Sequence, residues 1–176
     1  NHADKFPKVL ERTPDAITRL GIARTFQNIR LFKSLSVFEN VLIAKHMRAK
    51  AGVFSAVFRL NAKEEKVMRE DTMRLLDILE LADLKDEVAS SLPYGKQRRL
   101  EIARALATDP KMLLLDDPTV GIDVAAKAAI ARLIRSIADY NNGVLLISSE
   151  MEELERLCDR VLILSKGEIK KELCRN

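Results

Sequence analysis

The first part of the chain has the hydrophobic spacing of helices, interrupted by one short strand. Thr13 and Pro14 supply a side-chain cap and a first-turn residue, which together favour a helix start. Ser36 and Glu39 stand three residues apart in the capping-box pattern, which favours a second helix. We therefore predict helices over residues 14–20, 36–48 and 63–81, a strand over residues 22–26 and a polar loop over residues 27–33.

After Ser91 the pattern changes to short apolar runs that alternate with helical spacing. A continuous apolar run such as residues 112–115 is typical of a strand buried on both faces of a parallel sheet. We predict helices over residues 98–107, 124–140 and 150–157, and strands over residues 112–115, 144–147, 160–164 and 168–173. This alternation indicates an α/β fold with a mostly parallel, doubly wound sheet, into which a helical block over residues 37–84 is inserted.

Composition and charge fit a globular chain without a nucleic-acid partner. The 176 residues carry 30 basic and 26 acidic side chains, but the two signs are interleaved and only 5% of the residues are aromatic. Interleaved charges are typical of solvated helix faces, and few aromatics are available for base stacking. Cys158 and Cys174 lack metal-ligand spacing, and His2 and His46 are isolated, so none of them predicts a metal site.

The first candidate chemistry lies where an apolar strand ends in two carboxylates. Three leucines at 113–115 are followed by Asp116 and Asp117 and then by Pro118-Thr119. Open α/β sheets bind ligands at the carboxyl ends of their strands. In nucleotide hydrolases an acid at this place holds Mg²⁺, and a following acid orients or deprotonates the attacking water. An Asp-Pro turn without catalytic function explains these residues equally well.

The second candidate is a glycine-containing turn at residues 91–97, which precedes an arginine-rich helix. Free N–H groups and the helix dipole at such a helix start favour a phosphate. Taken alone, the segment fits an ordinary loop and a surface helix better.

Together the two segments resemble the signature and Walker B regions of the ABC ATPases. That family has Leu-Ser-Gly-Gly-Gln before a helix, then an aliphatic strand that ends in Asp-Glu-Pro. Order and spacing agree over nearly the whole chain. The matching segments are Leu92-Pro93-Tyr94-Gly95-Lys96-Gln97, Leu113-Leu114-Leu115-Asp116-Asp117-Pro118-Thr119, Gly121-Ile122-Asp123 at the family's D-loop and Arg24-Thr25-Phe26-Gln27 at its Q-loop.

The resemblance implies that ATP and Mg²⁺ bind between two ATPase subunits that dimerise head to tail. Asp116 would support Mg²⁺, and Asp117 would act as the base or orient the attacking water. Gln27 would sense Mg²⁺ and that water, Ser149 stands at the position of the family's switch histidine, and Asp123 would couple the two sites. The residues implied to face the nucleotide of the partner subunit are Leu92, Pro93, Tyr94, Gly95, Lys96 and Gln97.

The sequence departs from the family pattern at several of these positions. Pro93 replaces the serine that offers a hydroxyl and an N–H to phosphate, and it can donate neither. Asp117 replaces the usual glutamate, which retracts the carboxylate by about one bond; a misplacement of ~1 Å can cost on the order of a hundredfold in rate. Ser149 supplies no imidazole near the γ-phosphate. These departures also permit a degenerate partner subunit that hydrolyses little ATP.

No Gly-x-x-x-x-Gly-Lys-Ser/Thr loop occurs in the sequence, so we expect the chain to be inactive alone. We interpret residues 1–176 as one ABC ATPase domain that is incomplete at its N-terminal side. Its helical signature subdomain would span about residues 34–100, and residues 1–33 and 101–176 would form the remainder of the core.

Two subfamilies contribute to the resemblance. The segments around Gln27 and Gly95 look like branched-chain amino-acid importers, whereas Gly121-Ile122-Asp123-Val124 and Ser148-Ser149-Glu150-Met151 look like monosaccharide importers. The amino-acid group covers more residues, so import of branched-chain amino acids is the favoured function. Implied partners are membrane permease subunits and a second ATPase subunit, at the cytoplasmic face of the membrane. A DNA-maintenance ATPase head ranks last, because residues 27–91 are too few for coiled-coil arms.

Overall fold

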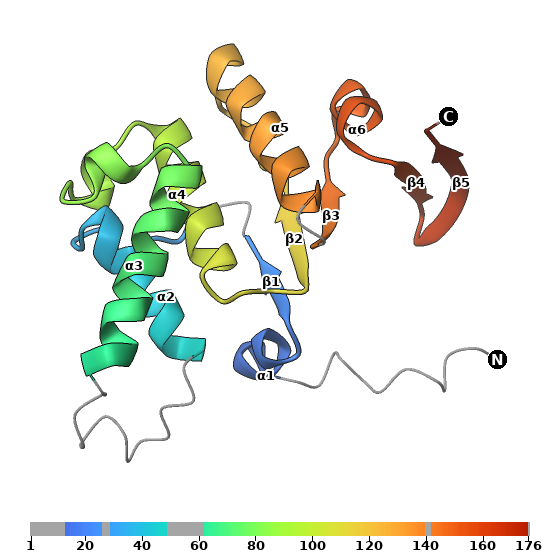
Figure 1. Ribbon diagram of the computed structural model, residues 1–176. Helices are drawn as coiled ribbons and strands as arrows, with labels where there is room; N and C mark the ends of the chain where they lie inside the picture. Colours follow the sequence, from blue (N-terminus) through green and yellow to red (C-terminus); the bar gives the residue numbers. More distant parts are fainter. Residues whose placement is uncertain (1–12, 26–28, 49–61, 140–141, 176) are drawn as a thin grey trace.

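The computed structural model describes residues 13–25, 29–48, 62–139 and 142–175 (Figure 1). A helical subdomain lies on one side of a three-stranded sheet, and a two-stranded hairpin lies at the opposite end of the molecule (Figure 1). The predicted α/β fold with a mostly parallel sheet and an inserted helical block is confirmed.

The sheet has the order β1-β2-β3, and all three strands are parallel. The strands are β1 (Ile22–Arg24), β2 (Met112–Asp116) and β3 (Gly143–Ile147). Their register places Arg24 opposite Leu114 and Asp116 opposite Ile147, so the carboxyl ends of the three strands meet at one edge. Short helix α1 (Pro14–Arg19) precedes β1 and has the predicted Thr13 cap, and Gly21 adopts a φ of +87° between the two elements. Phe26, the end of the predicted strand, lies outside the described residues.

The helical subdomain comprises α2 (Val37–Arg48), α3 (Ala62–Ile78) and the start of α4 (Tyr94–Leu106). Two short 3-10 turns, η3 (Ala82–Leu84) and η4 (Ala89–Ser91), connect α3 to α4. The predicted capping box is present, since Ser36 N–H donates to Glu39 Oε2 at 2.8 Å and Glu39 N–H donates to Ser36 Oγ at 3.2 Å. Fully buried apolar side chains join the three helices and the turns: Val37, Val41, Leu76, Leu79, Leu81, Ala89, Leu100 and Ile102.

Asn40 fixes the loop that leads from the sheet into α2. Its side chain is fully buried. Its Oδ1 accepts from Phe32 N–H at 3.0 Å, and its Nδ2 donates to Phe32 O at 3.0 Å and to Ser36 O at 2.9 Å. A buried amide with these bonds holds the loop against the helix, because leaving the amide unpaired would be costly.

Two predicted helix boundaries were wrong. Helix α4 begins at Tyr94 rather than Arg98, so Gly95 lies in its first turn and not in a turn before it. Pro93, with its fixed φ, occupies the N-cap position and allows the earlier start. Helix α3 ends at Ile78 instead of 81, and Glu80 beyond it adopts a left-handed φ of 55°.

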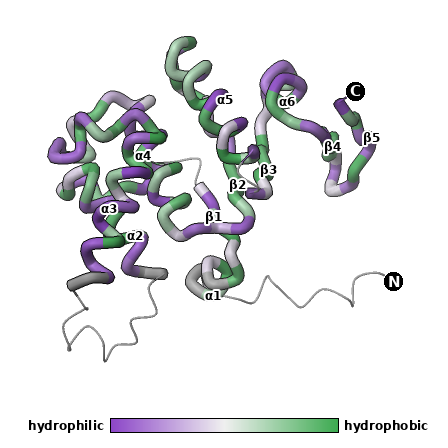
Figure 2. Tube along the Cα trace, viewed as in Figure 1, coloured by the Kyte–Doolittle hydropathy of each residue, from purple (hydrophilic) through white to green (hydrophobic). Residues whose placement is uncertain are grey.

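The C-terminal part contains α5 (Val124–Asp139), α6 (Met151–Leu157), β4 (Arg160–Ser165) and β5 (Glu168–Cys174). One face of α5 is buried, at Ile130, Leu133, Ile134 and Ile137. Strands β4 and β5 pair antiparallel with each other and form a separate sheet from β1–β3. Figure 2 shows hydrophobic residues concentrated in β2 and β3, whereas the helical subdomain alternates between hydrophobic and hydrophilic turns.

Candidate functional site

The two aspartates lie where β2 leaves the sheet, as predicted. Asp116 is the last residue of β2, and its Oδ2 accepts from Arg24 Nη2 at 2.9 Å. Arg24 ends the neighbouring strand β1, so parallel pairing brings a cation and an acid to the same edge. This ion pair was not predicted. The sequence signal was available, because both residues close adjacent strands that end at the same edge.

Asp117 has two properties that are typical of functional residues. Its φ of 44° is in the left-handed region, which is uncommon for a non-glycine residue. Its Oδ1 is buried and has no hydrogen-bond partner within the described part of the chain. The backbone is held, since Asp117 N–H donates to Ile147 O at 2.9 Å. The backbone of Asp117 is therefore fixed, while its Oδ1 accepts no hydrogen bond from these residues.

The start of α4 is fixed by bonds to the residues before it. Pro93 O accepts from Lys96 N–H at 2.9 Å and from Gln97 N–H at 3.0 Å. Gln97 Nε2 donates to Leu92 O at 2.8 Å. No side chain caps this helix start, and the first N–H groups of an α-helix have no intrahelical acceptor. Lys96 stands where the family pattern Leu-Ser-Gly-Gly-Gln has its glutamine, which is a further departure that was not predicted.

Gly95 makes a close approach to α5. A Cβ at this position would lie 3.0 Å from Ala126 Cβ and 3.5 Å from Ile122 Cγ2. Close packing between two helices therefore accounts for this glycine, in addition to the phosphate contact that the resemblance implies. The neighbouring Tyr94 is about half exposed.

Arg98 joins the start of α4 to the acidic turn. Its Nη2 donates to Asp116 O at 2.9 Å and to Asp117 O at 2.8 Å, and its Nε donates to Pro118 O at 3.2 Å. Its Nη1 is 2.6 Å from Glu101 Oε2, and both side chains are almost completely buried. Sequence reasoning missed this group. The signal was an Arg–Glu pair at i,i+3 on the core face of the helix.

The remaining predicted site residues lie around this edge or outside the described chain. Asp123 caps α5, because its Oδ1 accepts from Ala126 N–H at 2.9 Å. Ser149 is exposed and lies two residues beyond Ile147, which is bonded to Asp117. Gln27 lies outside the described residues. The fold thus brings Asp116, Asp117 and Ser149 to one edge of the sheet, next to the start of α4.

The edge fits a magnesium ion in its donor chemistry. Mg²⁺ takes one or two protein carboxylates and retains several waters. Asp116 and Asp117 offer these carboxylates, and the buried Oδ1 of Asp117 has no hydrogen-bond partner among the described residues. Within the described ranges no group of three or more His, Cys, Asp or Glu side chains is arranged to hold a metal ion.

Three further titratable groups have shifted pKa values, and packing or local hydrogen bonds explain each shift. Burial lowers the pKa of Arg104, whose guanidinium lies 4.6 Å from the Phe32 ring centroid. Burial and the neighbouring Asp159 raise the pKa of the Cys158 thiol, which disfavours the reactive thiolate. Hydrogen bonds from Ser36 lower the pKa of Glu39, as expected in a capping box.

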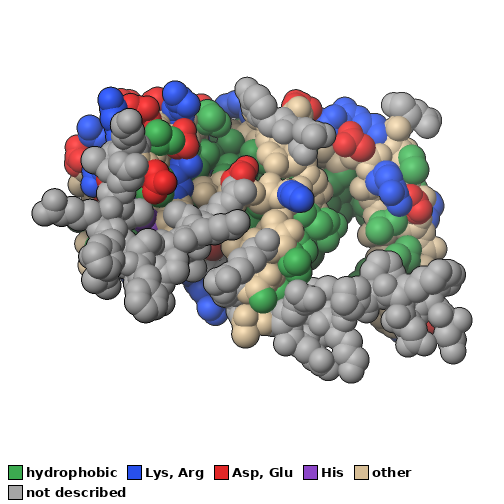
Figure 3. Space-filling view, turned by 60° about the horizontal axis from the view of Figure 1, so that its bottom comes forward, with side chains coloured by type: hydrophobic (Ala, Val, Ile, Leu, Met, Phe, Trp, Pro, Cys, Tyr) green, Lys and Arg blue, Asp and Glu red, His purple; other side chains and the backbone are tan. Residues whose placement is uncertain are grey.

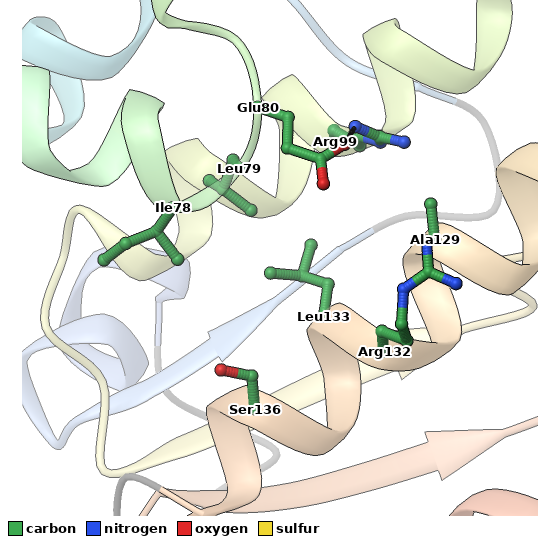
Figure 4. Close-up of a pocket in the computed structure, with 8 residues that line it drawn as sticks. All are labelled: Ile78, Leu79, Glu80, Arg99, Ala129, Arg132, Leu133 and Ser136. Atoms are coloured by element: carbon green, nitrogen blue, oxygen red, sulfur yellow. Dashed lines mark hydrogen bonds and ion pairs between the residues drawn. The ribbon is translucent and has the colours of Figure 1, made fainter.

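A small pocket of about 160 Å³ lies away from the aspartates, where α3 ends against α4 and α5 (Figure 4). Arg99 Nη1 lies 2.5 Å from Glu80 Oε2 at its rim, and Arg132 on α5 points toward this pair (Figure 4). Leu79 and Leu133 form part of its apolar lining. The ion pair ties the end of α3 to α4.

Comparisons with known proteins identify the family of the chain. The family model of the ABC transporter matches residues 6–120. LivG of Salmonella typhimurium, a high-affinity branched-chain amino acid transport ATP-binding protein, is 36% identical over 156 residues, which cover 86% of this chain and 60% of LivG. The ribose import ATP-binding protein RbsA 2 of Rhizobium meliloti is 41% identical over 145 residues, which cover 82% of this chain and 28% of RbsA 2.

A solved structure has the same fold. The ADP conformation of MJ1267, an ATP-binding cassette of an ABC transporter, has a TM-score of 0.77 and 27% identity and covers 93% of this chain and 65% of that one. The chain belongs to the ABC transporter family, and its fold is that of an ATP-binding cassette. It spans 60% of the length of LivG. None of the described helices is long and apolar enough to cross a membrane.

Proposed function

We propose that the chain is part of the ATP-binding subunit of an ABC importer for branched-chain amino acids. The observation that carries this proposal is the 36% identity to LivG over 86% of the chain. The bonds from Arg98 of α4 to the carbonyls of Asp116 and Asp117 support it. In an ATPase dimer, the aspartates would serve one nucleotide and the start of α4 would contact the other. The proposal includes a peripheral position at the cytoplasmic face, beside permease subunits.

In this proposal Asp116 and Asp117 serve the nucleotide held by the chain's own sheet. Asp116 would hold Mg²⁺, which supplies electrostatic stabilisation to the transferred phosphoryl group. Mg²⁺ would then replace the Arg24 guanidinium as the cation beside the Asp116 carboxylate. Asp117 would accept a hydrogen bond from the attacking water through its unpartnered Oδ1, with Gln27 and Ser149 nearby in the family pattern.

The start of α4 would face a nucleotide held by a second ATPase subunit. The free N–H groups of its first turn suit a phosphate, and Lys96 adds a positive charge beside them. Pro93 contributes neither a hydroxyl nor an N–H, so the contact would rest on the following residues. Asp123, at the start of α5, would lie at the dimer interface, and residues 34–100 would form the signature subdomain.

A substitution of Asp117 tests this assignment. In the protein expressed from its complete gene, Asp117→Asn should lower ATP turnover by roughly a hundredfold or more while Mg·ATP still binds. Asp139→Asn, at the far end of α5, is the matched control and should leave turnover unchanged. Robust turnover that survives Asp117→Asn would remove the catalytic role of Asp117.

Two alternatives have specific support. Identity of 41% to RbsA 2 favours a sugar importer. Turnover by a reconstituted transporter should rise with a leucine-loaded binding protein, and a rise with a ribose-loaded one instead would favour that alternative. Pro93, Asp117 and Ser149 favour a degenerate partner subunit, and an absence of turnover in the wild-type protein would support it.

A further inference from the structure

Arg98 is a buried cation to which the proposed chemistry assigns no task. Its side chain is 2% exposed, and its partner Glu101 is 6% exposed. Burying two charges carries a large desolvation penalty that is offset only by good geometry and further hydrogen bonds. The additional hydrogen bonds of Arg98, to the carbonyls of residues 116–118, help to offset this penalty.

Those bonds reach three consecutive carbonyl groups, at residues 116, 117 and 118. A guanidinium is a rigid planar fork with five donors. One such fork bonded to three successive carbonyls fixes the path of the turn, including the left-handed backbone of Asp117. The direction of the Asp117 carboxylate is therefore set from α4 as well as from the bond to Ile147.

The other end of this connection is the start of α4. Arg98 lies one helical turn after Tyr94, and Gln97 bonds back to Leu92 O. Gly95 packs directly against Ala126, which holds the same turn against α5. The Arg98 side chain thus bonds the first turns of α4 to the backbone of residues 116–118.

We propose that Arg98 is a positioning residue that couples the start of the signature helix to Asp116 and Asp117. The inference rests on the proposed ATPase function, in which the helix start faces the partner's nucleotide and the aspartates face the chain's own. A shift of α4 on one nucleotide would then move the carboxylates at the other. The coupling acts through backbone carbonyls, so it requires a forked donor and not merely a positive charge.

The test compares three variants by hydrogen exchange. Arg98→Met alone removes the cation that is paired with the buried Glu101 and is expected to destabilise the fold. Arg98→Met/Glu101→Leu replaces the pair with apolar side chains of similar size, which is commonly tolerated. In this double variant the protection of α4 should persist, while the amides within residues 117–120, which are those of Asp117, Thr119 and Val120, should exchange about tenfold faster or more. Wild-type protection at residues 117–120 would contradict the proposal.

Arg98→Lys keeps a cation beside Glu101 but loses the fork. It should also speed exchange at residues 117–120, to a smaller extent than the double variant. If the double variant fails to fold, Arg98→Lys decides in its place, and protection equal to wild type contradicts the proposal.

Kinetics separate this proposal from the proposed function. In the protein expressed from its complete gene, the double variant should lower kcat by about tenfold or more with KM nearly unchanged. An unchanged kcat, or a lower kcat without faster exchange at residues 117–120, would contradict the coupling. If the wild-type protein does not hydrolyse ATP, the proposed function fails, and the exchange experiment still determines whether Arg98 holds the turn.

Discussion

The helical subdomain and the C-terminal hairpin differ sharply in how they bury apolar side chains. Val37, Leu76 and Leu100 in the subdomain are fully buried, whereas Leu164 and Ile169 in the hairpin are 68% and 61% exposed. Leu145 and Ile147 of the neighbouring strand β3 are also exposed. Figure 3 shows hydrophobic side chains along a hollow between the body of the molecule and its C-terminal end.

The comparison indicates where the stability of the chain resides. Close packing and buried hydrogen bonds hold the subdomain and the acidic turn, whereas the hairpin depends mainly on its own strand pairing. Contiguous exposed apolar surface is uncommon on a monomer and marks faces that pack against other structure. Helix α4 and Asp117 belong to the well-packed region, which suits the proposed site because that site requires fixed geometry.

The largest expected effect comes from truncating a core side chain of α4. Leu100→Ala should lower the free energy of unfolding by about 2–5 kcal/mol, because it leaves a cavity among close-packed helices. Leu164→Ala is the matched control in the hairpin and should change it by about 0.5 kcal/mol or less. Denaturant unfolding followed by circular dichroism measures both, and equal effects would remove the contrast between the regions.

The next effect concerns the buried amide of the loop before α2. Asn40→Ala removes the acceptor of Phe32 N–H and the donor to three carbonyls, at Phe32, Leu35 and Ser36, and should cost about 1–3 kcal/mol in the free energy of unfolding. Asn142→Ala, near the start of β3, is a control at a half-buried loop position. A loss for Asn40→Ala no larger than that of the control would show that the loop is not held in this way.

Hydrogen exchange sharpens the comparison without any substitution. The amides of β4 and β5 should exchange through local opening, at free energies well below that of the amides of α2 and α4. The measurement is a native-state exchange series in increasing denaturant. Protection of the hairpin equal to that of α4 would mean that both regions open as one cooperative unit.

The smallest expected effect is the pH dependence of the capping box. Hydrogen bonds from Ser36 lower the pKa of Glu39 below its ordinary value of 4.5. A lowered folded-state pKa contributes stability that is complete above the unfolded value and is lost as the pH falls through the folded value. Glu39→Gln should therefore flatten the stability profile below about pH 4.5, as thermal melts at pH 3 to 6 would reveal. An unchanged profile would contradict the cap's contribution.

Much of the fold could be predicted from the sequence because local signals agreed with it. The capping box at Ser36 and the apolar run of β2 each act over a few residues. The start of α4 was misplaced because Gly95 is a turn former in isolation, whereas its packing depends on Ala126, which lies 31 positions later in α5 (126 − 95).

The candidate site was predicted only in part, for a related reason. Asp116 and Asp117 follow from the strand that precedes them, but the partners that position them do not. Arg24 and Asp116 are 92 positions apart and meet because β1 pairs with β2, and Arg98 reaches the acidic turn from α4. Such contacts depend on tertiary packing, which the hydrophobic spacing within one segment does not predict.

Residues 92–97 and 113–119 resemble the signature and the acidic strand end of an ABC ATPase, but the sequence has no Gly-x-x-x-x-Gly-Lys-Ser/Thr loop, so the chain should bind ATP poorly. Titration calorimetry of Mg·ATP into the 176-residue chain tests it most directly. We expect no tight binding, with a Kd on the order of 1 mM or weaker, because the sequence lacks the motif whose backbone N–H groups surround the β- and γ-phosphates. A saturable isotherm with micromolar affinity would contradict it.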